Sequence, residues 1–220
     1  MRQTDAVLAP PALSIRPYHA DDHDAVYEVC VRTGDGGADA SGLYPNDDLL
    51  PDIYAGPYLY LEPGLAFVLD DGGRAVGYVI GTADTARFVV RYRHDWIPLM
   101  ARRYQERPDP PTTAYEAHVA RLFHPERMLV DELASYPAHL HIDLLPAYQR
   151  AGYGRRLINT FLDEVARAGA TAVYLAVAKA NTAAQEFYRR VGFELLDVGD
   201  QGGSALFFGR AASLEGQPST

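Results

Sequence analysis

The chain has 220 residues, enough for one domain with an elaborated insertion, and its 48% apolar and 22% charged residues are typical of globular proteins. A formal charge of −9 disfavours nucleic acid as a partner, because that binding is dominated by phosphate neutralisation, and no apolar run reaches the ~18 residues that span a membrane. The single cysteine, Cys30, excludes an internal disulfide framework and a multi-cysteine zinc site.

The two ends of the chain are predicted to be flexible. Residues 1–12 and 211–220 are rich in small and polar residues, which leaves residues 13–210 as a single predicted domain. The first residues, MRQTDAVLAPPALS, lack the apolar core of a signal peptide, so we expect a cytoplasmic protein.

The first half of the chain predicts a strand, a helix, a hairpin and a helical insert. Residues 14–17 are extended, and Asp21 or Asp22 can cap a helix with Val26, Val29 and Cys30 on one face. Residues 64–84 contain two apolar strands around DDGG, a strong hairpin signal. Residues 84–137 contain two stretches of helical periodicity, interrupted by RPDPPTT.

The second half alternates strands with helices. Residues 139–145 alternate as a strand does, and a helix follows that ends near Gly169. TAVYLAVA predicts a buried strand, NTAAQEFYRRVG a helix that ends at Gly192, and FELLDVG and SALFFGR two closing strands. The fold class is therefore α/β or layered α+β, with a mixed sheet, helices on both faces and the insert between the third and fourth strands.

The stretch QRAGYG, residues 149–154, joins a strand to a helix and predicts a phosphate site. Backbone N–H groups at a helix start lack internal partners and carry partial positive charge, and the glycines allow a pyrophosphate to approach closely. Gln149, Arg150, Arg155 and Arg156 add donors or positive charge. The alternative is a glycine-containing helix start with solvated arginines.

Two other phosphate motifs are excluded here. The chain has no G-x-x-x-x-G-K-[ST], and Leu157 occupies the third glycine position of a G-x-G-x-x-G. A dinucleotide fold also requires this turn after its first strand, whereas here it comes late in the chain.

Residues 138–195 resemble the GNAT N-acetyltransferases. QRAGYG resembles that family's [RQ]-x-x-G-x-[GA] signature, LLPAY its V-x-P-x-[YW] approach, and NTAAQEFYRRVGF its N-x-x-A-x-x-[FL]-Y-x-x-x-G-F block. A finer resemblance is to the acetyltransferase-like C-terminal domain of O-GlcNAcase, carried by IRPYHADDHDAVYEVC, FVLDDGGRAVGYVIGTAD and WIPLMARRY. This resemblance implies a free-standing bacterial-type relative without the glycosidase domain.

The resemblance implies acetyl-CoA as cosubstrate, bound in a V-shaped split between two parallel central strands. The pyrophosphate would lie on the turn, the pantetheine along the strand before it, and a backbone N–H near Leu144 would polarise the thioester carbonyl. The residues expected to bind acetyl-CoA are Ile142, Asp143, Leu144, Gln149, Arg150, Ala151, Gly152, Tyr153, Gly154, Arg155, Asn181, Ala184 and Tyr188.

Two residues of the last block have alternative interpretations. Tyr188 matches the tyrosine that often protonates the departing thiolate in this family, but next to Phe187 it could be a core residue. Asn181 would contact the pantetheine, and it is also a good helix N-cap; both roles can coexist.

The general base departs from the family pattern. A frequent glutamate position is occupied by Ala176, and Asp143 is the best substitute as a second catalytic residue. His139 and His141 lie on the same strand face as Asp143. His141 and Asp143 could form a proton relay or a structural pair, and the His-x-His-x-Asp pattern is too weak to predict a metal site.

The acceptor side is predicted from residues 35–60. Acids and tyrosines there would suit a small cationic amine, although a solvated loop with core tyrosines is the alternative. Trp96 and Ile97 could cap the acceptor pocket or form a homodimer contact. The residues of interest in that segment are Asp35, Asp39, Tyr44, Asp47, Asp48, Tyr54, Tyr58 and Tyr60.

The sequence thus predicts an acetyl-CoA-dependent N-acetyltransferase for a small amine, with no nucleic-acid or membrane partner. The alternative is a CoA-binding module without acetyl transfer that acts as a sensor or interaction domain, which the alanine at position 176 keeps open. A histone-type acetyltransferase follows only by analogy, and fold analogy does not determine substrate.

Overall fold

The structure is a computed structural model that describes residues 13–106, 110–199, 203 and 205–213. The ends predicted to be flexible therefore fall largely outside the described residues. Within those ranges no helix has the length and apolar character needed to cross a membrane.

A seven-stranded mixed sheet forms the centre of the molecule. Its strands run in the order β1-β2-β3-β4-β5-β7-β6, and every neighbouring pair is antiparallel except β4 and β5, which are parallel. This confirms the predicted fold class. The strands are β1 (Ser14–Pro17), β2 (Phe67–Asp71), β3 (Arg74–Thr82), β4 (Ala138–Leu144), β5 (Ala172–Ala178), β6 (Glu194–Leu195) and β7 (Ala205–Ala211).

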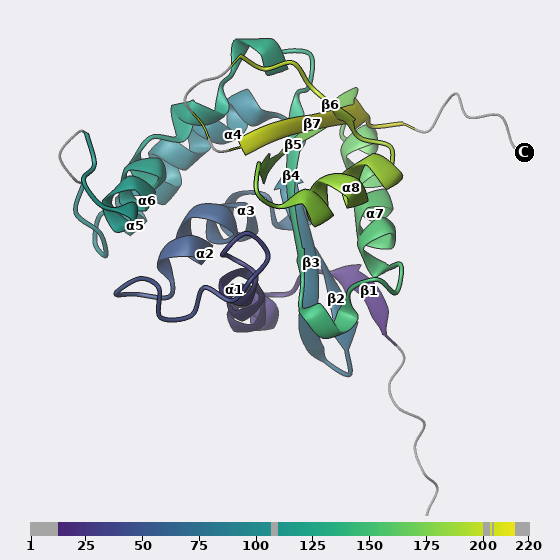
Figure 1. Ribbon diagram of the computed structural model, residues 1–220, viewed down its shortest axis with the longest axis horizontal. Helices are drawn as coiled ribbons and strands as arrows, with labels where there is room; N and C mark the ends of the chain where they lie inside the picture. The colour runs from purple at the N-terminus through teal and green to yellow at the C-terminus, as the bar shows by residue number, and fades with distance from the viewer. Residues whose placement is uncertain (1–12, 107–109, 200–202, 204, 214–220) are drawn as a thin grey trace, which may run out of the picture.

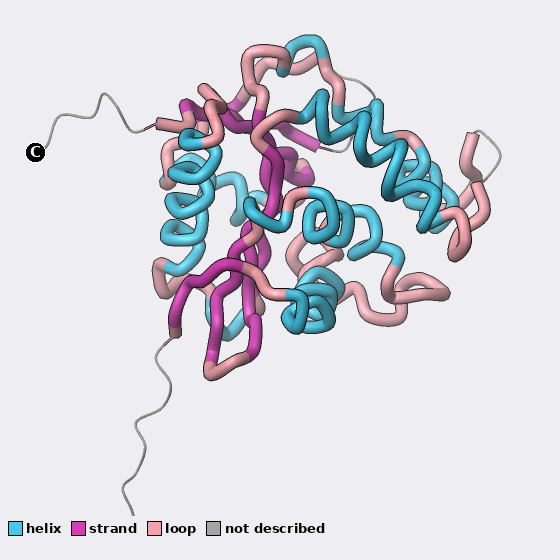
Figure 2. The backbone as a smooth tube through the Cα atoms, turned by 180° about the vertical axis from the view of Figure 1, so that it is seen from behind, coloured by secondary structure: helices cyan, strands magenta, loops and turns pink. Residues whose placement is uncertain are grey.

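Helices cover both faces of the sheet. Figure 1 shows α7 on one side and α1 to α3 on the other, and the reverse view in Figure 2 shows the same separation. The α-helices are α1 (His23–Arg32), α2 (Leu49–Tyr54), α3 (Gly56–Leu61), α4 (Thr85–Arg91), α5 (Ile97–Met100), α6 (Ala114–Phe123), α7 (Tyr153–Arg167) and α8 (Thr182–Arg190). Shorter turns are the 3₁₀ segments η1 (Ala20–Asp22), η2 (Pro63–Leu65), η4 (Pro125–Met128), η5 (Asp131–Leu133) and η6 (Pro146–Tyr148), and the π-helical η3 (Tyr92–Trp96).

The insert predicted between the third and fourth strands is confirmed as helical. It contains α4, η3, α5, α6, η4 and η5. The segment of residues 35–60, in which the sequence has many acids and tyrosines, is partly helical. It contains α2 and most of α3, whose Leu49, Ile53 and Tyr58 are buried in the core.

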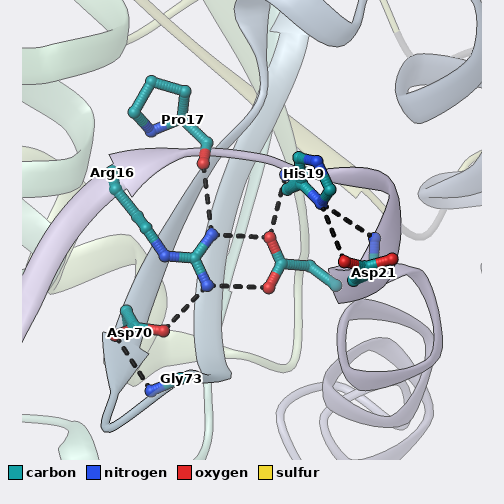
Figure 3. Close-up of polar contacts among 7 residues, drawn as sticks. Arg16, Pro17, His19, Asp21, Asp70 and Gly73 are labelled. Atoms are coloured by element: carbon teal, nitrogen blue, oxygen red, sulfur yellow. Dashed lines mark hydrogen bonds and ion pairs between the residues drawn. The ribbon is translucent and has the colours of Figure 1, made fainter.

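The strand β1, the start of α1 and the strand β2 are joined by one arginine (Figure 3). Arg16 donates to both oxygens of Asp22, at 2.6 and 2.8 Å, and to Asp70 at 2.8 Å. Asp22 precedes α1 but makes no side-chain capping bond to it, because its carboxylate accepts from Arg16 and from the His19 backbone N–H. The bond from Arg16 lowers the pKa of this buried carboxyl.

The parallel strands β4 and β5 separate after a very short shared ladder. They pair only at Ala138 with Val173 and at His139 with Tyr174. Beyond these positions β4 continues to pair with β3 as far as Leu144, while β5 continues to pair with β7 as far as Ala178. The two strands therefore leave a gap in the middle of the sheet, as the predicted V-shaped split requires.

Candidate functional site

The turn before α7 is shaped by two residues in the left-handed region. Arg150 has φ +62° and Gly152, the N-cap, has φ +85°. When residues of left-handed and right-handed backbone conformation follow one another, their N–H groups point into one concavity, and such a concavity binds anions. The first N–H groups of α7 have no intrahelical partners, so the turn presents donors toward the gap.

The two glycines of this turn have different roles. Nothing lies within 4 Å of a Cβ built on Gly152, so its open side is available to a ligand. A Cβ on Gly154 would lie 3.0 Å from Phe187 Cζ, so this glycine permits close packing of α7 on α8. Gly154 is thus explained by packing, and Gly152 by backbone conformation.

The edge of β4 that faces the gap offers backbone groups. The Leu145 N–H donates to the Val76 carbonyl oxygen of β3 at 3.0 Å. Because successive residues of a strand direct their polar groups to opposite edges, Ile142 and Leu144 direct theirs into the gap. Gln149 Nε2 donates to the Leu144 carbonyl oxygen at 2.8 Å, so this side chain fixes the turn to the strand end.

The other predicted turn arginines are partly engaged. Arg155 donates from Nη2 to the carbonyl oxygen of Arg190 at 3.3 Å, which links the start of α7 to the end of α8. The guanidinium of Arg156 lies 5.4 Å from the centre of the Tyr153 ring, a cation–π distance. Arg150 and Arg155 line the cavity described below, and Arg156 does not.

The helix α8 forms the opposite wall of the gap. Asn181 Oδ1 accepts from the Ala184 N–H at 3.0 Å, so the predicted N-cap exists and the side-chain amide nitrogen remains available. The loop after α1 approaches from the other face, where a Cβ on Gly37 would lie 3.3 Å from Asn181 Nδ2.

Tyr188 lies on α8 with a side chain that is 9% exposed and lines the cavity. Its ring packs against Phe193 and Phe208, with centroid distances of 6.0 and 6.2 Å. Burial and the nearby Asp143 charge raise its pKa, so the hydroxyl stays protonated at neutral pH and can donate.

Asp143 lies on β4, on the face toward α1. Its Oδ2 accepts from the Tyr78 hydroxyl at 2.6 Å. Burial raises the pKa of Asp143 to about 7, and the Tyr78 bond opposes that rise only in part. The carboxyl therefore titrates far above its ordinary range, as a general base that acts near neutral pH requires.

The histidines of β4 belong to a separate cluster. Tyr58 Oη lies 2.7 Å from His139 Nε2 and 3.1 Å from His141 Nε2, and His139 Nδ1 lies 2.8 Å from Thr85 Oγ1. Thr85 donates to the Pro137 carbonyl oxygen, so it accepts from His139. It follows that Tyr58 donates to His139 and accepts from His141 Nε2, which leaves His141 Nδ1 unprotonated.

Burial lowers the pKa of His139 well below its usual value and that of His141 to about 4, so both rings are neutral at pH 7. His141 bonds to Tyr58 and Asp143 to Tyr78, with no hydrogen bond between His141 and Asp143. The hydrogen bonds therefore form two adjacent clusters on one face of β4, the histidines with Tyr58 and Asp143 with Tyr78. They do not form a direct proton relay from His141 to Asp143.

A single cavity of ≈ 1610 Å³ connects these groups. It extends from the turn before α7, through the gap between β4 and β5, to α2 and α6, and it exceeds the usual size for one small ligand. Ala176 of β5 is exposed on its wall, at the position where the family often has a glutamate. Within the described part of the chain, Asp143 and Glu186 are the acids that line it.

The predicted acceptor residues are mostly elsewhere. Asp39 bonds to Ser41 and Asp47 to the Gly42 N–H, while Asp48 forms an ion pair with Arg103. The indole of Trp96 is buried and donates to the Asp52 carbonyl oxygen, so Trp96 does not cap the cavity.

The side chains that enclose the acceptor end come from α2, α3, α6 and η4. Those that carry an aromatic ring or a charge are Tyr54, Tyr58, His118, Arg121 and Arg127. His118 and Arg121 are three residues apart on one helix face, a spacing visible in the sequence, but nothing local indicated that this face is turned toward β4.

A model of the acetyltransferase (GNAT) family matches residues 39–193. A protein called SsHAT, known from its crystal structure, is 50% identical with a TM-score of 0.89, over 92% of this chain and 100% of that one. The PaiA N-acetyltransferase of Thermoplasma acidophilum, solved in complex with coenzyme A, shares the fold at 14% identity and a TM-score of 0.55, over 91% of this chain and 99% of that one.

Among curated proteins, O-GlcNAcase of Rattus norvegicus is 28% identical over 202 residues, which are 87% of this chain and 22% of that protein. The chain thus spans about a fifth of the length of the O-GlcNAcases that it matches.

Replacement of the buried carboxyl gives a prediction about stability. The folded pKa of Asp143 exceeds its unfolded value, so the native state binds more protons and loses stability as pH rises from about 4 to about 7. We expect the free energy of unfolding of Asp143→Asn, relative to the native chain, to increase across this interval and to level off above it. Urea denaturation of both proteins from pH 4 to pH 8 measures the difference, and a difference independent of pH would contradict the assignment.

Proposed function

The chain belongs to the acetyltransferase (GNAT) family, and on that premise we propose that it binds acetyl-CoA and transfers the acetyl group to the amine of a small molecule. Both resemblances predicted from the motifs, to this family and to O-GlcNAcase, are confirmed. The observation that carries the proposal is the gap between β4 and β5, which opens directly onto the left-handed turn at Gly152.

The turn and the strand edge supply the two contacts that acetyl-CoA requires. The pyrophosphate would accept from the N–H groups of the turn, and the pantetheine amides would pair with the backbone groups of Ile142, because the Leu144 carbonyl oxygen already accepts from Gln149. The Leu144 N–H faces the gap and would donate to the thioester carbonyl oxygen, where negative charge develops in the transition state. Asn181 and Ala184 would border the pantetheine from α8.

The chemical step needs a proton acceptor and a proton donor. The amine nitrogen attacks the thioester carbonyl carbon, the carbon–sulfur bond breaks, and the electron pair leaves with sulfur. Asp143 would take the proton from the amine, and the neutral Tyr188 hydroxyl would give a proton to the thiolate. His141 Nδ1, unprotonated and two residues from Asp143, provides a second position for the amine proton.

The alternative function is a CoA-binding module that transfers nothing. Ala176 favours it, because β5 contributes no acid to the cavity wall. The two functions differ in one measurement: acetyl transfer releases coenzyme A only when an acceptor amine is present, whereas a binding module releases none with small amines or basic peptides. A cytoplasmic location and a homodimer remain predictions.

The phosphate turn can be tested with two variants of one residue. Asn and Asp both tolerate the left-handed region and have almost the same shape, but only Asp places a charge against the pyrophosphate. We expect Gly152→Asp to weaken acetyl-CoA binding by about 100-fold or more, and Gly152→Asn to weaken it by much less. Isothermal titration calorimetry of folded variants measures this, and equal affinities for the two variants would remove the turn from the binding site.

The proton donor can be tested by removal of one oxygen. Tyr188→Phe is expected to lower kcat by roughly 100-fold, the lower range for general acid catalysis, and to leave acetyl-CoA affinity nearly unchanged. Tyr136→Phe is the matched control, because Tyr136 does not line the cavity. Steady-state release of coenzyme A measures both variants, and an unchanged kcat for Tyr188→Phe would exclude Tyr188 from the reaction.

A further inference from the structure

The acceptor end of the cavity differs in charge from the sequence prediction. We define this end by the lining residues of α1, α2, α3, β4, α6 and η4 and of the loop after α1. Acids of residues 35–60 were expected to make it negative, yet Asp35, Asp39, Asp47 and Asp48 do not line it. The charged side chains that line it are Arg121, Arg127 and Asp143.

Both arginines are held in place without a carboxylate. Arg121 Nη1 donates to the Tyr54 hydroxyl at 3.1 Å, and Arg127 Nε donates to the Arg121 carbonyl oxygen at 3.2 Å. Neither forms an ion pair with any acid in the described ranges. A guanidinium has five N–H donors, so most donors of both side chains remain available.

The nearest acid in sequence does not neutralise them. Glu126 precedes Arg127 but accepts from Arg93, at 2.5 Å from both Nε and Nη2. Arg103, by contrast, forms ion pairs with both Asp48 and Asp52. Arg121 and Arg127 have no such carboxylate partner among the described residues, and their hydrogen bonds go to the Tyr54 hydroxyl and to the Arg121 carbonyl oxygen.

The wall between the arginines and β4 is aromatic and uncharged. The His118 ring contacts Tyr54 with a centroid distance of 6.2 Å, and Tyr54 contacts His141 at 5.9 Å. Burial, followed by the charges of Arg121 and Arg127, lowers the pKa of His118 to about 4, so it is neutral at pH 7. His118 Nδ1 is buried without a hydrogen-bond partner among the described residues, and such an atom favours a state in which a ligand or water satisfies it.

The charges of this end are therefore arranged along the cavity. Asp143 lies toward the predicted thioester position beside Leu144, and the arginines of α6 and η4 lie beyond the aromatic wall. Arg121 and Arg127 are both exposed at this end of the cavity. A cationic patch on a protein of net charge −9 concentrates anions locally, against the overall charge.

We propose that the acceptor is an anionic amine, a small molecule that carries a carboxylate or phosphate group in addition to its reacting amine. Arg121 and Arg127 bind the anion, with the planar donor geometry that matches both groups, and Asp143 receives the amine. The inference rests on the proposed function and specifies its substrate class.

A direct binding measurement tests the arginines without turnover. Inorganic phosphate is titrated calorimetrically into protein saturated with coenzyme A, so that the turn before α7 is already occupied. We expect Arg121→Gln and Arg127→Gln each to weaken phosphate binding by about tenfold or more, and Arg87→Gln to leave it unchanged. Arg87 is the matched control because it is exposed on α4 and does not line the cavity.

Acceptor pairs then identify the anion. Release of coenzyme A is compared for lysine against cadaverine, which differ by a carboxylate, and for glucosamine 6-phosphate against glucosamine, which differ by a phosphate. In at least one pair we expect the member with the carboxylate or phosphate group to have a kcat/KM about tenfold higher or more, and this advantage to disappear in Arg121→Gln and Arg127→Gln. The pair that responds distinguishes a carboxylate from a phosphate acceptor.

Failure of this inference differs from failure of the proposed function. Equal phosphate affinity in all four proteins, or no phosphate binding to the native chain, overturns the anion site. A higher kcat/KM for cadaverine and glucosamine, which lack the anionic group, overturns it as well. If no amine causes release of coenzyme A, acetyl transfer is contradicted, but the anion site at the arginines is not. If coenzyme A does not bind, the phosphate titration is made on Gly152→Asp protein, in which the turn repels anions, and it decides the role of the arginines in the same way.

Discussion

The early separation of β4 from β5 is the constraint on which the rest of the site depends. Two parallel strands that share only two register positions leave the facing edges without a strand partner over the remaining residues, although the Leu144 carbonyl oxygen accepts from Gln149. Buried backbone polar groups need hydrogen bonds, so an unpaired edge inside a protein favours a ligand that supplies them. The gap also lets α8 and the turn before α7 approach the same cavity as β4.

Burial then sets the protonation states that the chemistry uses. The same desolvation raises the pKa values of Asp143 and Tyr188 and lowers those of His139 and His141. One strand face thus holds two neutral histidines, fixed by Tyr58, and next to them a carboxyl that titrates near neutral pH. The pKa of each group differs from its ordinary value because burial removes water from around it.

The sequence predicted what depends on local pattern. The hairpin was visible because Gly72 and Gly73 supply the two positive φ angles that a tight turn needs, and the order of strands and helices followed from periodicity. The turn at Gly152 and the cap at Asn181 were visible for the same reason. The acceptor end was predicted only in part: Tyr54 and Tyr58 of the predicted segment line the cavity, but its arginines come from α6 and η4. Nothing in the sequence specifies how an insert packs across a sheet. Asp48 was predicted there by its charge, whereas its carboxylate binds Arg103.

The central claim is that the gap and the turn form a site for coenzyme A. Isothermal titration calorimetry of the native chain with acetyl-CoA, coenzyme A and NAD tests it most directly. The account predicts micromolar binding of acetyl-CoA and coenzyme A, with no measurable binding of NAD, because the pantetheine would pair with β4 and NAD has no such arm. Failure of acetyl-CoA and coenzyme A to bind, or equal binding of all three ligands, would contradict it.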